Sequence, residues 1–150
     1  MCHYCGCRDI PLIKDYIAEH ESVTDLGGDA VRALSRGDRD SARSLARQMA
    51  AELRTHWHGE EDGLFAVMRE DSEYLSYIDA LVREHRELEA FLAALDLEDA
   101  AQREEFVRAV DELHHHIAKE EDSLFPASLT ALSGEQWDRA MAAWHTAHGS

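Results

Sequence analysis

Two stretches of the chain, sixty residues apart, share one pattern of histidine, carboxylate and apolar residues. Residues 52–65 read ELRTHWHGEEDGLF and residues 112–125 read ELHHHIAKEEDSLF, with eight of fourteen positions identical. Because residues four apart lie above one another on an α-helix, each copy places a histidine and a glutamate on one face. The pairs are His56 with Glu60 and His116 with Glu120. Imidazole and carboxylate are both metal ligands, so the two copies predict two halves of one metal site.

Single histidines on two further helical stripes complete this set. His20 and His85 each lie on the buried face of their predicted helix, at a position where an apolar residue is expected. In antiparallel helices of this length, both would come to about the depth of His56 and His116. Buried charges without partners are costly, and metal binding would offset that cost. We therefore expect a dinuclear metal site, with a structural polar network as the alternative.

Apolar periodicity predicts the helices that must position these side chains. The expected ranges are 9–35, 39–69, 74–96, 99–126 and the shorter 134–146. Asp9 is the expected N-cap of the first helix, and Gly27-Gly28 predicts a kink or break within it. Ser133-Gly134-Glu135-Gln136 resembles a capping box. Long amphipathic helices joined by short turns predict an all-α, up-down-up-down four-helix bundle with a short additional C-terminal helix.

Composition restricts the class of protein. The chain has 150 residues and a formal net charge of −16. An acidic surface repels nucleic acid and anionic membranes, so we expect neither as a partner. No apolar run approaches the ~20 residues that a membrane-spanning helix needs, and the N-terminus lacks the apolar core of a signal peptide. These features predict a cytoplasmic protein; whether it forms a homodimer stays open.

The N-terminus carries all three cysteines, Cys2, Cys5 and Cys7. Cys-x-x-Cys is a metal or redox spacing, but no second pair exists to complete a zinc site within one chain. A thiol or metal-handling tail and an inert tail are equally compatible with this pattern. We expect three regions: a Cys-rich tail at 1–8, the bundle at 9–132, and the C-terminal helix and tail at 133–150.

The ligand pattern resembles the hemerythrin-like (HHE cation-binding) family over residues from about 9 to 126. The matching elements are His20 in AEHES, His56 with Glu60, His85 in REHRE, and His116 with Glu120. The His-x-x-x-Glu order differs from the Glu-x-x-His order of ferritin-like di-iron proteins. The resemblance implies a four-helix bundle holding two non-haem iron ions. It further implies that the two glutamates and an oxo or hydroxo group bridge the irons.

One position departs from the family. Oxygen-carrying hemerythrins have a second histidine one turn after the first on the third helix, where this chain has Glu89. The departure argues against simple reversible O₂ carriage and leaves one iron with a carboxylate, a water or an open position. Glu89 is thus an additional candidate ligand, unless it points to solvent beside Arg86.

The function expected from these residues is binding of, or reaction with, O₂, peroxide or NO at a di-iron centre, in stress defence or in oxygen or iron sensing. The alternatives are a di-iron enzyme, either peroxidase- or catalase-like or O₂-activating, and an iron-storage module. Neighbouring polar residues leave the ligand face, and we expect them to be solvated or to accept hydrogen bonds from ligands: His58, His114, His115, Glu61, Asp62, Glu121 and Asp122.

Overall fold

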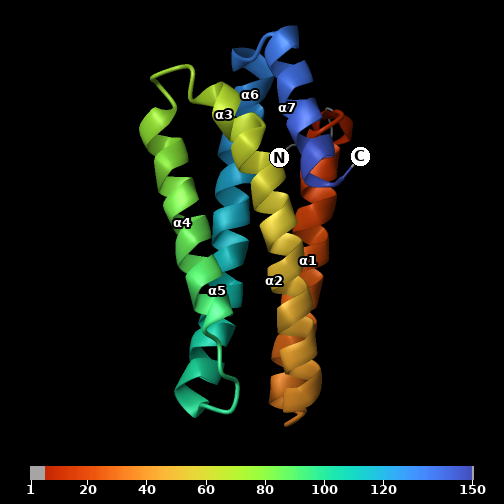
Figure 1. Ribbon diagram of the computed structural model, residues 1–150, viewed down its shortest axis with the longest axis vertical. Coiled ribbons are helices and arrows are strands. Elements are labelled where there is room, and N and C mark those ends of the chain that lie inside the picture. The colour runs from red at the N-terminus through yellow and green to blue at the C-terminus, as the bar shows by residue number, and fades with distance from the viewer. Residues whose placement is uncertain (1–5, 150) are drawn as a thin grey trace.

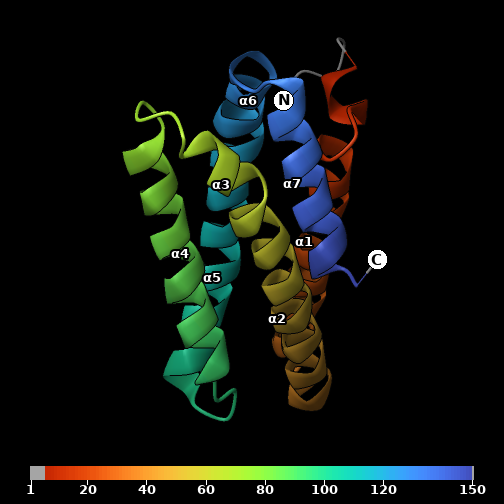
Figure 2. The same ribbon diagram turned by 45° about the horizontal axis from the view of Figure 1, so that its top comes forward.

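The computed structural model describes residues 6–149, which contain helices and no β-strand. Four long helices, α1 (Ile13–Ser35), α2 (Arg39–Asp62), α4 (Leu75–Ala93) and α5 (Ala100–Lys119), lie side by side, and α7 (Gly134–Ala147) packs along α2 (Figures 1 and 2). Short segments complete the chain: η1 (Cys7–Asp9), α3 (Leu64–Met68), the π-helical η2 (Glu120–Leu124) and α6 (Phe125–Ala131). The predicted all-α class is confirmed.

The first long helix begins later than the sequence predicts. Asp9 lies in η1 rather than at the N-cap, and α1 starts at Ile13. Leu12 interrupts the helix because its φ of 76° lies in the left-handed region, which non-glycine residues seldom adopt. Burial of the Leu12 side chain and a 3.3 Å hydrogen bond from its N–H to Asp15 Oδ2 hold this conformation.

Glycine has a packing role at Gly27 and a helix-ending role at Gly63. The expected break at Gly27-Gly28 is wrong, since α1 continues to Ser35. A Cβ atom at Gly27 would lie 3.2 Å from both Met49 Sδ and Val110 Cγ1, so glycine lets α2 and α5 approach α1. The predicted helix 39–69 instead ends at Asp62, before Gly63. A Cβ atom there would lie 2.5 Å from Gly59 O and 2.9 Å from Ala140 O.

The second repeat continues beyond its expected end at Pro126. The chain passes from α5 through one π-helical turn into α6, with no extended residue between them. Pro126 lies in the first turn of α6, directly after the π-helical turn, and it has no backbone N–H to donate to that turn. The predicted capping box of the last helix is confirmed, because Ser133 Oγ accepts from Gln136 N at 3.2 Å and Gln136 Oε1 accepts from Ser133 N at 2.9 Å.

Two apolar clusters fill the interior. One gathers the start of α1 with α3, α4, η2, α6 and α7, and includes Ile17, Leu64 and Leu81. The other lies along α1, α2 and α5 and includes Val23 and Leu53. On α1, His20 falls between Ile17 of the first cluster and Val23 of the second, so the candidate ligands form a polar layer between the two. Across the described residues, no helix combines the length and the hydropathy needed to cross a membrane.

Candidate metal centre

The structure brings six predicted residues into one buried layer. None of them is more than 6 % exposed: His20, His56, Glu60, His85, His116 and Glu120. The two His-x-x-x-Glu pairs arrive on α2 and on α5 with its continuation η2, as helical spacing requires. The two single histidines arrive on α1 and α4.

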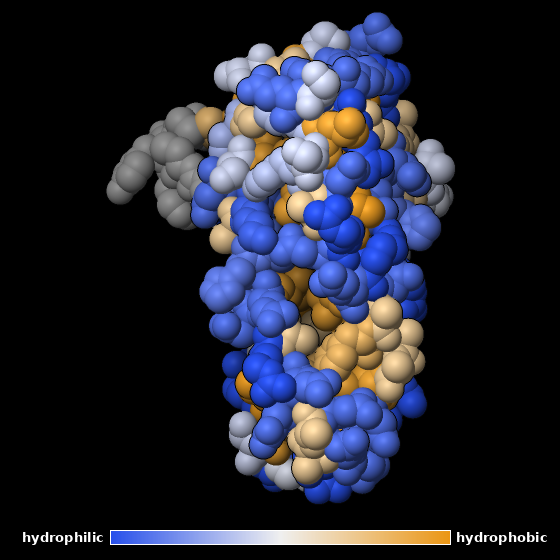
Figure 3. Space-filling model, turned by 90° about the vertical axis from the view of Figure 1, so that its left-hand side faces the viewer, coloured by the Kyte–Doolittle hydropathy of each residue, from blue (hydrophilic) through white to orange (hydrophobic). Residues whose placement is uncertain are grey.

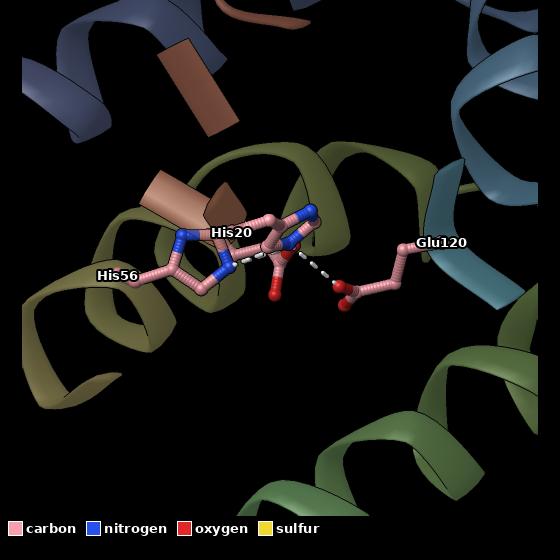
Figure 4. Close-up of side chains that lie close together, drawn as sticks. His20, His56 and Glu120 are labelled. Atoms are coloured by element: carbon pink, nitrogen blue, oxygen red, sulfur yellow. Dashed lines mark hydrogen bonds and ion pairs between the residues drawn. The ribbon is translucent and has the colours of Figure 1, made fainter. Parts of the chain in front are cut away.

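The histidines point their Nε2 atoms at the middle of this layer. His20 and His56 approach each other with their Nε2 atoms 3.1 Å apart, and His85 and His116 do so at 2.9 Å. Figure 4 shows the first of these pairs together with Glu120, which extends toward it from the opposite helix.

Both glutamates lie between the two histidine pairs. Glu120 places Oε1 3.1 Å from His20 Nε2 and Oε2 3.2 Å from His116 Nε2. Glu60 places Oε2 3.4 Å from His56 Nε2 and Oε1 3.4 Å from His85 Nε2. Each carboxylate therefore spans from one histidine pair to the other.

A second layer of four glutamates holds the outer Nδ1 atom of each histidine. Each helix supplies one glutamate to the histidine of the next helix around the bundle. The pairs are Glu19 with His56 at 2.9 Å, Glu61 with His85 at 2.7 Å, Glu84 with His116 at 3.3 Å and Glu121 with His20 at 2.7 Å. An ionised carboxylate only accepts hydrogen bonds, so each Nδ1 carries the proton. The neutral ring then directs an Nε2 lone pair into the centre.

The centre consequently consists of hydrogen-bond acceptors. Four Nε2 lone pairs surround four carboxylate oxygens, and none of the oxygens of Glu60 and Glu120 receives a hydrogen bond. Buried acceptors without donors are costly. This set of ligand atoms therefore fits bound cations, which imidazole nitrogen and carboxylate oxygen can coordinate.

The pKa values indicate that protons supply positive charge to this layer when no metal is bound. Burial alone would lower the pKa of His116, but the charge of Glu120 outweighs it and raises the pKa to about 9. Burial alone would raise the pKa of Glu120, whereas His116 holds it well below its usual value. Burial and the charge of Glu120 raise the pKa of Glu60. The layer thus attracts positive charge.

Two overlapping groups of ligand atoms lie close enough together to hold ions. The first comprises His20, His56, Glu60 and Glu120, with all ligand atoms within 4.8 Å of one another. The second comprises His85, His116 and Glu120 by the same measure. Glu120 belongs to both groups, so its two oxygens are suited to bridging two ions.

The remaining candidates lie elsewhere. Glu89 is half-buried and pairs with Arg86 at 2.6 Å outside the cluster, so the structure places it in the surface position that the sequence left open. Of the histidines in the two repeats, three are exposed: His58, His114 and His115. Cys2 and Cys5 lie outside the described residues, and Cys7 is half-buried in η1.

Two members of the second layer, Glu19 and Glu84, were not predicted from the sequence. Glu61 and Glu121 were expected either to be solvated or to accept from ligands, and they accept from His85 and His20. Glu19 and Glu84 were not considered. A signal existed, because a glutamate immediately precedes the single histidine in both AEHES and REHRE.

Aromatic side chains pack against the ligand rings. Phe125 stacks on His20 with ring centroids 5.9 Å apart, and Trp57 stacks on His85 at 4.9 Å. Tyr16 meets His56 edge-on at 5.8 Å, and its hydroxyl donates to Gly59 O at 3.2 Å rather than to the centre. Burial, followed by the charge of Glu60, raises the pKa of Tyr16 and keeps it protonated.

A helical protein with a buried layer of histidine and glutamate ligands is a candidate metal-binding protein of the bundle class. The chain matches the hemerythrin HHE cation binding domain over residues 12–128, and it belongs to that family. Comparison with curated proteins and with solved structures finds no match. Residues 129–149, which include α7, lie beyond the matched domain.

Proposed function

We propose that this chain is a non-haem di-iron protein that binds or reacts with O₂, peroxide or nitric oxide. The observation that carries the proposal is the set of inward-facing hydrogen-bond acceptors. It consists of four imidazole nitrogens and four carboxylate oxygens, and the carboxylate oxygens receive no hydrogen bond. A single tetrahedral zinc needs four ligands, fewer than this layer offers. Carboxylates that span two histidine pairs favour two ions, and the proposed cofactor is two irons with an oxo or hydroxo bridge.

The proposed architecture is an up-down-up-down bundle over 9–132, preceded by the Cys-rich tail 1–8 and followed by a C-terminal helix and tail at 133–150. Iron would supply reversible electron exchange at the centre. The chain supplies the rest: the second-layer glutamates fix the ring orientations and tautomers of the histidines. The apolar clusters above and below exclude water from the ligands.

The position of Glu89 bears on reactivity. Its ion pair with Arg86 keeps Glu89 away from the ligand layer. The half of the centre at His85 and His116 therefore gains no metal ligand from Glu89. We expect the reduced protein to oxidise quickly in air and the oxidised protein to consume hydrogen peroxide faster than metal-free protein. The Glu89→Gln variant should leave peroxide consumption unchanged. A reduced protein giving an oxygenated spectrum that persists for hours and reverses under vacuum would favour an oxygen carrier instead.

A cavity favours an enzyme as the second candidate function. It has a volume of about 530 Å³, lies between α4 and α5, and its lining includes His85 and His116. Trp57, Leu88 and Phe91 give it an apolar part beside charged residues, and ligand sites commonly combine apolar walls with a few polar groups. Figure 3 shows that the side of the molecule that carries α4 is hollowed and exposes apolar side chains there. Oxygen-dependent conversion of an added organic compound by the iron-loaded protein, abolished in the His116→Ala variant, would establish this alternative.

We propose a cytoplasmic protein whose partner is a small diatomic or peroxide ligand, acting without nucleic acid or membrane contact. The net charge of −16 supports the last two points through repulsion of other polyanions. Sedimentation at several protein concentrations would decide whether two copies form a homodimer.

A further inference from the structure

We infer that the groove between α2 and the end of α4 binds a small aliphatic carboxylate. Arg47 and Arg54 hold the carboxylate, and the alkyl chain lies against alanine and leucine side chains. The groove has a volume of about 680 Å³, which is within the range of small-molecule sites. None of the six residues of the ligand layer lines it, so the groove is separate from the metal centre.

The groove lies where α4 ends beside α2, at the lower end of the bundle in Figure 1. Glu98, in the loop that follows α4, pairs with Arg39 at 3.0 Å and with Arg43 at 2.7 Å. Arg103 Nη1 also donates to Leu97 O at 2.9 Å. These contacts join the loop to the start of α2 and to α5, so the groove is formed before a ligand arrives.

The apolar part of the lining is entirely aliphatic. It offers no ring on which an aromatic ligand could stack, so it favours an alkyl chain. Two of its leucines, Leu92 and Leu95, are only half-buried, and an alkyl chain laid over them would remove apolar surface from water. The six apolar residues are Ala46, Ala50, Leu92, Ala93, Leu95 and Leu97.

The charge of the lining is opposite to that of the whole chain. Three arginines, Arg43, Arg47 and Arg54, stand against one carboxylate, Asp96, in a protein with a net charge of −16. Asp96 Oδ1 accepts from Glu98 N at 3.0 Å, so this carboxylate is engaged within its own loop. The groove is therefore a local cationic site on an acidic protein.

Two of the three arginines are available to a ligand. Arg43 is already paired with Asp40 at 2.9 Å, in addition to its contact with the loop. Within residues 6–149, neither Arg47 nor Arg54 makes an ion pair or a side-chain hydrogen bond. Both are exposed, so their positive charges lack a partner from the described part of the chain.

Helical spacing brings these two arginines to one place. Arg47 and Arg54 lie two turns apart on the same face of α2, and Ala50 lies between them, three residues after one and four before the other. The small side chain of Ala50 leaves room above the helix for a carboxylate that both guanidinium groups can reach. Guanidinium groups bind carboxylates with paired, charge-assisted hydrogen bonds.

The rest of the surface limits the kind of anion. Polyanions such as nucleic acids are repelled by the net charge of −16. A single carboxylate meets less repulsion, and its alkyl chain gains from the apolar contact. An aliphatic monocarboxylate therefore matches both the two arginines and the aliphatic lining.

The site is tested by isothermal titration calorimetry of the purified protein with decanoate. We expect one decanoate per chain. Acetate, which has the charge without the chain, and decyltrimethylammonium, which has the chain with the opposite charge, should each bind at least about tenfold more weakly. The Arg47→Gln and Arg54→Gln variants should each weaken decanoate binding about tenfold, as expected for loss of a charged hydrogen bond.

The matched control for charge is Arg83→Gln. Arg83 is an exposed arginine on α4 that does not line the groove, so the variant removes one positive charge elsewhere and should bind decanoate like wild type. Filling the space between the two arginines with Ala50→Leu should weaken decanoate binding at least about tenfold. Its matched control is Ala51→Leu, at an exposed neighbour outside the groove. Circular dichroism and metal content should be unchanged in all of these variants.

Three results would overturn the proposed site. The first is wild-type protein that shows no saturable decanoate binding, or binds decyltrimethylammonium equally well. The second is an equal loss of affinity in Arg47→Gln and Arg83→Gln, which would reduce the effect to net charge. The third is retention of the protein by phosphatidylglycerol vesicles through Arg47 without binding of free decanoate, which would assign the groove to a lipid surface.

Discussion

Glu61 on α2 lies 2.7 Å from the Nδ1 atom of His85 on α4, one of four such contacts that join neighbouring helices around the centre. Burial alone would raise the pKa of Glu61, but the hydrogen bond from His85 lowers it, so the carboxylate stays ionised and acts as an acceptor. The contact both fixes the His85 ring and pulls charge toward Nδ1, which makes Nε2 a better ligand.

Replacing one second-layer glutamate should therefore weaken metal binding without unfolding the protein. For Glu61→Gln we expect a loss of 10- to 100-fold in metal affinity, the usual range for such groups, with helix content unchanged by circular dichroism. Glu87→Gln, an exposed residue on α4, is the control and should bind like wild type. Wild-type affinity in Glu61→Gln would show that the contact does not support the ligand.

Ligand choice within the histidine-rich runs gives a second prediction. The His56→Ala and His116→Ala variants should lose metal because both rings lie in the buried layer. The His58→Ala and His114→Ala variants should retain most of it, since both side chains are exposed on other helical faces. Metal content per chain after desalting is the measurement. Equal losses in all four would show that the ligand face is wrong.

The metal-free protein should lose stability as the pH rises. His116 has a folded-state pKa of about 9, above the 6.5 of an unperturbed histidine. The protonated form is thus favoured by folding, so its contribution is complete below pH 6.5 and disappears as the pH passes 9. A shift of this size corresponds to roughly 3 kcal/mol.

Urea unfolding at pH 6 and pH 9.5 measures this difference. The free energy of unfolding should be lower at the higher pH for metal-free protein. Metal-bound protein should lack this loss, because bound cations take the place of the protons. A metal-free protein that became more stable with rising pH would rule out proton pairing in the layer.

Gly63 provides a test of packing. A Cβ atom there would lie 2.5 Å from Gly59 O and 2.9 Å from Ala140 O, both backbone atoms that cannot turn aside. Gly63→Ala should lower the free energy of unfolding by about 1–3 kcal/mol, the range for adding a group to a packed site. Gly134→Ala is the control, since nothing lies within 4 Å of its added Cβ, and thermal unfolding of both variants should separate them. Similar melting temperatures would show that the backbone around Gly63 adjusts to the added Cβ.

The sequence predicted the all-α class, the long helices and the gathering of six buried residues, because helical periodicity relates His56 to Glu60 directly. Two boundaries depended on tertiary contacts that periodicity does not contain. Leu12 is buried with a positive φ just before α1, and Gly63, where α2 ends, lies close to the backbone of both α2 and α7.

The second layer was harder to predict for a similar reason. Each of its contacts joins different helices, and the partner of Glu19 stands thirty-seven residues away. Helical phase places Glu19 beside His20, but only helix packing shows that it serves His56. The contacts of Trp144 and His148 with Glu19 span still longer separations, so no local pattern could indicate them.

The central claim, two irons held by the buried layer, is tested most directly by metal analysis of protein expressed with added iron, together with its absorption spectrum. We predict two irons per chain and near-ultraviolet charge-transfer bands that disappear on reduction. One zinc per chain under the same conditions, without those bands, would contradict the account.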